Sequence, residues 1–166
     1  MKKIVIFLFF VIIYMSMLTK NNNILIPSNS IRIRIIANSN DINDQQTKYM
    51  IKEEITKEIY PKLENVSNYN DAKEIINNSM EDINNIIRKY TSDFSIYFGN
   101  NYFPKKEYKG VMYKEGNYES LVIKLGDAKG KNFWCVLFPP LCMIDESKLN
   151  DVSYSFLVNE LLNKIK

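Results

Sequence analysis

The N-terminus carries an apolar run over residues 4–18 that directly follows Lys2 and Lys3. Positive residues ahead of such a run are typical of an export signal and stay on the cytoplasmic side. As a helix the run rises about 22 Å, less than a hydrocarbon core of about 30 Å, and no small-x-small cleavage site follows it. Residues 1–20 are therefore predicted to be a signal peptide or an uncleaved signal anchor. In both cases the rest of the chain lies outside the cytoplasm, and its membrane contact is limited to this segment.

The remaining chain has no net charge. Of the 22 Lys and Arg residues, Lys2, Lys3 and Lys20 precede residue 21, whereas all 19 Asp and Glu residues follow it. Nineteen basic and 19 acidic residues are left, so the net charge of +3 belongs to the N-terminal segment. A neutral body argues against a nucleic-acid partner, which would require a basic surface.

Residues 31–35 alternate strictly between isoleucine and arginine. This period predicts a strand with the isoleucines on one face and Arg32 and Arg34 on the other. We expect an exposed stalk over residues 21–30 before the strand, and a single domain over residues 31–166.

Periodicity and turn residues predict the rest of the domain. Apolar residues at helical spacing predict helices at 42–60, ended by Pro61, at 71–90 and at 152–165. Alternating or apolar runs predict strands at 94–98, 118–125 and 133–138, with a long hairpin or loop over 102–117. The order predicts an α+β fold, in which helices pack on one face of a mainly antiparallel sheet.

The stretch 126–132 has the sequence GDAKGKN, which weakly resembles a phosphate-binding loop. It is one residue too short, lacks the Ser or Thr, and precedes a predicted strand rather than a helix. We therefore interpret it as a hairpin turn between the last two strands.

Both cysteines and the only tryptophan lie in the apolar segment NFWCVLFPPLC, residues 132–142. Outside the cytoplasm, Cys135 and Cys142 can form a disulfide if Pro139-Pro140 turns the chain between them. The alternative is two buried thiols, because free cysteine packs as a small apolar residue. A redox-active dithiol is disfavoured because the segment has no Cys-x-x-Cys and no basic residue between the thiols.

The chain contains no histidine. This excludes Ser-His and Cys-His nucleophiles and the usual zinc hydrolase sites, and no cofactor or metal is expected. Carboxylate pairs such as Asp41 with Asp44, or Glu115 with Glu119, remain candidates for acid–base chemistry. An extracytoplasmic carboxylate-dependent hydrolase or wall-processing enzyme is therefore the alternative function.

Two segments resemble the signatures of the stage II sporulation protein R family. They are IRIRIIANSNDINDQQTKYMIKEEI at 31–55 and NYFPKKEYKGVMYKEGNYESLVIKLGDAKGKNFWCVLFPPLC at 101–142. The chain departs from the family pattern at Asn40, where the family usually has Asp, at Phe133, where it usually has Trp, and near Val122, where it usually has Arg. The first departure weakens any role for a charge at that position.

The resemblance implies a non-catalytic signalling protein of endospore formers. Such a protein is exported from the forespore into the space between the forespore and mother-cell membranes. There it activates a membrane-embedded aspartic-type protease, which cleaves the precursor of the mother-cell factor sigma-E.

Polar and aromatic residues within the two signatures are the candidate contacts with that protease. Each has a competing structural explanation: a turn, a helix cap, core packing, or, for the arginines, the solvated face of an edge strand. The candidates are Arg32, Arg34, Asn38, Asp44, Gln45, Tyr118, Glu119, Asn132 and Trp134.

Overall fold

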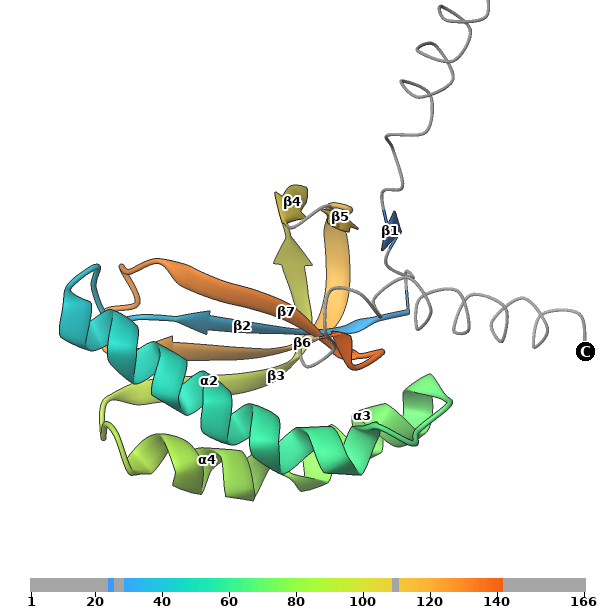
Figure 1. The fold of residues 1–166 in the computed structure, drawn as a ribbon, viewed down its shortest axis with the longest axis horizontal. Coiled ribbons are helices and arrows are strands. Elements are labelled where there is room, and N and C mark those ends of the chain that lie inside the picture. The colour runs from blue at the N-terminus through green and yellow to red at the C-terminus, as the bar shows by residue number, and fades with distance from the viewer. Residues whose placement is uncertain (1–23, 26–28, 109–110, 142–166) are drawn as a thin grey trace, which may run out of the picture.

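The computed structural model describes residues 24–25, 29–108 and 111–141 (Figure 1). The predicted leader, most of the predicted stalk, the predicted helix at 152–165 and Cys142 lie outside these residues. Among the helices in the described ranges, none is both long and apolar enough to cross a bilayer.

The main sheet has four strands in the spatial order β3-β6-β2-β7. Strand β2 pairs in parallel with β6 and antiparallel with β7, and β3 pairs antiparallel with β6. The strands are β2 (Ile31–Ile36), β3 (Phe94–Phe103), β6 (Gly116–Leu125) and β7 (Asn132–Phe138).

Three helices cover one face of this sheet (Figure 1). They are α2 (Ile42–Leu63), α3 (Tyr69–Asn78) and α4 (Met80–Arg88). On the other side, the chain forms a small second sheet in the order β1-β5-β4, with β1 at Ile24–Leu25, β4 at Lys106–Tyr108 and β5 at Val111–Tyr113. The predicted α+β fold, with helices on one face of a mainly antiparallel sheet, is confirmed.

The core lies between the four-stranded sheet and the helices. On β2, Ile31, Ile33 and Ile35 are at most 3% exposed, and they pack in one cluster with isoleucines of α2 and α4. Burying each such side chain stabilises the fold by about 1.5–3 kcal/mol. The predicted alternation of β2 is therefore confirmed, and it directs Arg32 and Arg34 away from the helices.

The predicted hairpin between the last two strands is wrong. Strand β2, from the start of the domain, lies between β6 and β7, so residues 126–131 connect two strands that are not neighbours. The connection passes the C-terminal end of β2, where Lys129 N donates to Asn38 O and Gly130 N donates to Ala37 O, both at 2.9 Å.

Two of the predicted helices also differ from the structure. Helix α2 continues through Pro61 to Leu63. Proline has no N–H, so the helix lacks one backbone hydrogen bond at Pro61, and it ends two residues later. The predicted helix at 71–90 is two helices that meet at Ser79, with φ −89° and ψ 2°. The Ser79 hydroxyl donates to Ile75 O at 2.9 Å, a local bond that competes with continuous helix.

Two further segments refine the prediction. Strand β3 runs beyond its predicted end at residue 98 and continues to Phe103. Within the predicted stalk, Ile24–Leu25 pairs with β5, and Ser30 is buried.

Candidate functional site

The sheet face that turns away from the helices collects most of the candidate contacts. Because side chains alternate along each strand, the strand register decides which residues share this face. We call it the arginine face, and the register places on it Arg32, Arg34, Ile36, Ser95, Tyr97, Gly99, Asn101, Phe103, Tyr118, Ser120, Val122, Lys124, Asn132 and Trp134.

Arg32 is buried in an aromatic cage on this face. Its guanidinium carbon lies 3.3 Å from the ring centre of Tyr118, 5.2 Å from that of Phe103 and 5.7 Å from that of Tyr113. The side chain is 1% exposed, its Nη2 donates to Lys114 O at 3.4 Å, and its Nε has no hydrogen-bond partner. Burial lowers the pKa of Arg32, and the neighbouring Tyr118 acts in the opposite direction. The interpretation of this arginine as part of a solvated edge strand is wrong, because β2 is an internal strand.

Arg34 is half-buried, and two residues of β7, Trp134 and Asn132, contact its guanidinium group. Its guanidinium carbon lies 4.5 Å from the ring centre of Trp134. With the Asn132 amide turned so that its oxygen faces the arginine, this oxygen accepts from Nε at 3.1 Å and from Nη2 at 2.9 Å. Burial lowers the pKa of Arg34, but a guanidinium remains cationic at neutral pH. The structure thus brings three candidates, Arg34, Asn132 and Trp134, into direct contact.

Trp134 makes cation–ring and ring–ring contacts on this face. It meets Phe103 edge to face with ring centres 5.0 Å apart, and Phe103 meets Tyr118 in the same way at 6.2 Å. Lys106 Nζ lies 5.3 Å from the ring centre of Trp134. The tryptophan is half-buried, so part of its ring is open to solvent.

The arginine face is cationic. The register places Arg32, Arg34 and Lys124 on it and no Asp or Glu, and among the described residues no ion pair joins either arginine to a carboxylate. The helices on the other side carry charges of both signs, eight acidic and six basic residues over α2, α3 and α4, so only the arginine face is of a single sign.

Three other candidates, Asn38, Asp44 and Gln45, form a clamp at the end of β2. Asn38 Nδ2 donates to Asp44 Oδ2 at 2.9 Å, and Asn38 Oδ1 accepts from the backbone N of Asp127 at 2.9 Å. Gln45 Nε2 donates to Ser39 O at 2.8 Å. These bonds fix the start of α2 against the connection at 126–131. They give the three residues a structural role, and their contact with a partner stays a prediction.

Sequence reasoning missed several members of this clamp. The backbone N of Lys131 donates to Asn40 Oδ1 at 2.8 Å, and the buried Lys48 donates from Nζ to Gln45 Oε1 at 2.6 Å and to Lys131 O at 3.0 Å. Two glycines complete it, because a Cβ at Gly126 would lie 2.3 Å from Asn38 Oδ1 and a Cβ at Gly130 2.0 Å from Ser39 O. Gly126 also has a φ of +50°, which favours glycine. The only sequence signal was the glycine spacing within a predicted turn.

The last two candidates separate. Tyr118 covers Arg32 on the arginine face, whereas Glu119 points to the helix side and pairs with Lys73 of α3 at 3.1 Å. Glu119 is therefore not placed with the other contacts of the second signature.

Of the carboxylates proposed for acid–base chemistry, Asp44 and Glu119 each have a partner outside the proposed pair. Asp44 accepts hydrogen bonds from Ser39 and Asn38, which lower its pKa and oppose a role as proton donor. It lines a hollow of about 220 Å³ together with Asp93 and Tyr90. Within the described part of the chain, no three His, Cys, Asp or Glu residues are grouped so that they could hold a metal ion.

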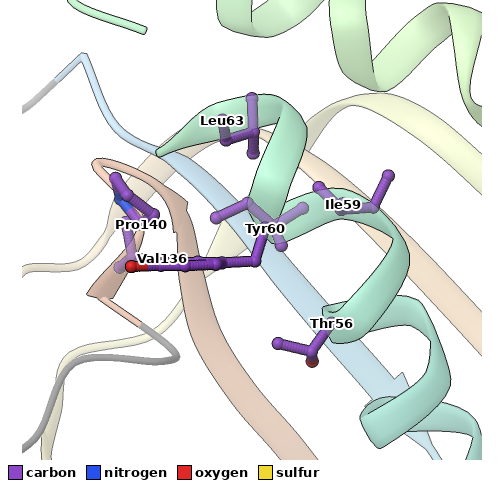
Figure 2. Close-up of a pocket in the computed structure, with 7 residues that line it drawn as sticks. Thr56, Ile59, Tyr60, Leu63, Val136 and Pro140 are labelled. Carbon is purple, nitrogen blue, oxygen red and sulfur yellow. The ribbon is translucent and has the colours of Figure 1, made fainter. Parts of the chain in front are cut away.

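A small apolar notch lies between α2 and the end of β7 (Figure 2). It is lined by Thr56, Ile59, Tyr60, Leu63, Val136, Leu137 and Pro140, and its cavity volume is about 10 Å³. Such a volume holds about one water molecule, so the notch offers no room for a ligand.

Cys135 is half-buried on β7 and lies opposite Ile33 of β2. Its predicted partner, Cys142, lies outside the described residues. The disulfide therefore stays a prediction.

Comparison with known proteins identifies the family. The family model described as stage II sporulation protein R matches residues 27–148. The stage II sporulation protein R of Bacillus subtilis (strain 168) is 36% identical over 135 residues, which is 78% of this chain and 60% of that protein. This chain thus spans less than two thirds of the length of that relative. No solved structure matches the chain. Because the family model covers most of the chain, including the clamp and the arginine face, the chain belongs to the stage II sporulation protein R family.

Proposed function

We propose that this chain is an exported sporulation signal that activates a membrane-embedded aspartic-type protease and so triggers cleavage of the sigma-E precursor. The observation that carries the proposal is the family match over residues 27–148. The protein is exported from the forespore into the space between the two membranes, with residues 1–20 as signal peptide or anchor. Its Cys135–Cys142 disulfide forms there.

The described fold supports a binding role for the domain. Its clamp residues bond to one another, whereas the arginine face presents cations with no carboxylate partner in the described residues. A protein that activates another must bind the active state more tightly than the inactive state. We propose that the arginine face makes this differential contact with the exposed part of the protease.

The proposal is tested in a spore-forming bacterium that lacks its own copy of this gene. The full chain and a chain without residues 1–20 are expressed in the forespore, and processing of the sigma-E precursor is followed by immunoblot. We expect the full chain to restore processing and the shortened chain to fail, because it stays in the forespore cytoplasm.

One control makes the result decisive. The shortened chain fused to an unrelated cleavable signal peptide should restore processing, which separates export from a loss of folding. If neither the full chain nor this fusion restores processing, although both are exported and folded, the activator role is wrong for this chain.

A further inference from the structure

We propose that the arginine face binds an acidic, extended segment of a partner protein, with a carboxylate of that segment on Arg34. This inference rests on the proposed function for the identity of the partner, but its chemistry follows from the face itself. It specifies what the partner must present: carboxylates on a chain that can lie across the strands.

One row of side chains on the face crosses all four strands; in it Tyr97 is exposed, Arg34 and Trp134 are half-buried, and Val122 is buried. Trp134 pairs with Arg34, Arg34 pairs with Val122, and Val122 pairs with Tyr97. With neighbouring strands about 4.8 Å apart, the row is about 14 Å long, the span of four or five residues of extended chain. Tyr97 is 57% exposed, so both ends of the row offer an aromatic ring to a partner.

Arg34 has donors left for a carboxylate. With the Asn132 amide oxygen turned toward it, Arg34 uses Nε and one hydrogen of Nη2 to bond this oxygen. A guanidinium has five N–H donors, so three remain, on Nη1 and Nη2 at the far end of the group. These two nitrogens can bind one carboxylate through two parallel hydrogen bonds, and the stacked Trp134 ring keeps the plane of the guanidinium fixed.

The charge around Arg34 favours an acidic partner over a neutral one. Lys124 lies on the same face and Lys106 lies over Trp134, both exposed, while the caged Arg32 adds a positive charge beneath the surface. The strand register places no Asp or Glu among the described residues of the arginine face. Complementary charge therefore speeds association and excludes basic partners.

The test uses the fluorescence of Trp134, which is the only tryptophan in the chain and lies in the row. The full chain is purified in a neutral detergent and titrated with a capped peptide of about ten alternating Glu and Ser residues, long enough to cross the row. A peptide of alternating Gln and Ser is the neutral counterpart. We expect saturable binding of the acidic peptide only, weakened by added salt.

The matched variants are Arg34→Gln and Arg88→Gln. Both remove one guanidinium, but Arg88 is exposed at the end of α4, on the helix side of the sheet. We expect Arg34→Gln to weaken acidic-peptide binding about tenfold, the loss expected for a charge-assisted bidentate contact, and Arg88→Gln to leave it unchanged. Equal binding by the two variants, or equal binding of the two peptides, overturns the inference.

Two other occupants of the face are tested in the same assay. If vesicles that contain phosphatidylglycerol change Trp134 fluorescence through Arg34 and the acidic peptide does not, the face binds lipid headgroups and the inference is wrong. If the acidic peptide binds only after residues 144–166 are removed, the face is covered by the chain itself and the inference is also wrong.

The sigma-E precursor assay separates this inference from the proposed function. If the full chain restores processing and Arg34→Gln restores it equally well, the function stands and the inference fails. If the acidic peptide binds through Arg34 but the exported chain restores no processing, the face has the stated chemistry and the proposed function fails.

Discussion

Asn40 shows that a departure from a family pattern can preserve the interaction that matters. Its Oδ1 accepts from the backbone N of Lys131 at 2.8 Å, and it therefore acts as a hydrogen-bond acceptor. The Asp that the family usually has there accepts in the same way, so the bond does not require a negative charge.

This comparison predicts the effect of two substitutions at Asn40. Asn40→Asp should leave the free energy of unfolding within about 0.5 kcal/mol, whereas Asn40→Ala should lower it by about 0.5–1.5 kcal/mol, the net worth of one hydrogen bond. Denaturant unfolding of the purified chain at pH 7 measures both. Equal losses for the two variants would show that the contact with Lys131 is not what residue 40 contributes.

Asp44 gives the clamp a pH dependence. Hydrogen bonds from Ser39 and Asn38 lower its pKa in the folded protein, so the unfolded state binds its proton at higher pH than the folded state does. The stabilisation is complete above the ordinary pKa of an aspartate, near 4, and is lost as the pH falls through the lowered value. In Asp44→Asn this loss is removed, and we expect a shallower decline of unfolding free energy between about pH 5 and pH 3. The free energy of unfolding is measured by denaturant unfolding at each pH. If it declines in parallel in the two proteins, Asp44 is not the source of this pH dependence.

At the scale of elements, the connection from β6 to β7 depends on close contact between two loops. A Cβ at Gly130 would lie 2.0 Å from the carbonyl oxygen of Ser39, and backbone at that distance cannot move aside without breaking the clamp. We predict that Gly130→Ala lowers the free energy of unfolding by about 1–3 kcal/mol, the range of a misfit that forces backbone shifts. Thermal unfolding followed by circular dichroism measures the loss.

Gly99→Ala is the matched control. A Cβ there would lie 2.6 Å from the Tyr97 hydroxyl, but this is the far end of an exposed side chain that can swing away. Its effect should stay within about 0.5 kcal/mol, as for most surface changes. A loss at Gly99 as large as that at Gly130 would mean that any side chain in place of glycine, and not the contact with Ser39, accounts for the effect.

The same elements show how far the sequence predicts this fold. Alternation in residues 31–35 correctly predicted β2 and both of its faces, because the period of a strand is a local property. The insertion of β2 between β6 and β7 was not predicted, because pairing between distant segments leaves no local pattern. For the same reason the sequence could name both Asn38 and Arg34 as candidate contacts without their surroundings; the first bonds to Asp44 and Asp127, and the second lies half-buried on the arginine face.

At the scale of the whole molecule, charge is distributed unevenly although the part of the chain after the leader is neutral. The register places basic side chains and no carboxylate on the arginine face, whereas the three helices on the other side carry eight acidic and six basic residues. A neutral protein with unevenly distributed charge has a directional field, which orients a charged partner before contact. The face, and not the net charge, should therefore decide which peptides bind.

Reversing the charge of the face tests this directly. In the double variant Arg34→Glu/Lys124→Glu, we predict that binding of the Glu–Ser peptide is lost and that a Lys–Ser peptide binds instead, because the introduced carboxylates repel the acidic peptide and attract the basic one. Trp134 fluorescence reports both titrations. The matched control, Arg88→Glu/Lys57→Glu, changes the net charge by the same amount at two exposed positions on α4 and α2. If this control reverses the peptide preference to the same extent, the net charge alone governs binding. If the control keeps the original preference, the charge of the arginine face governs binding.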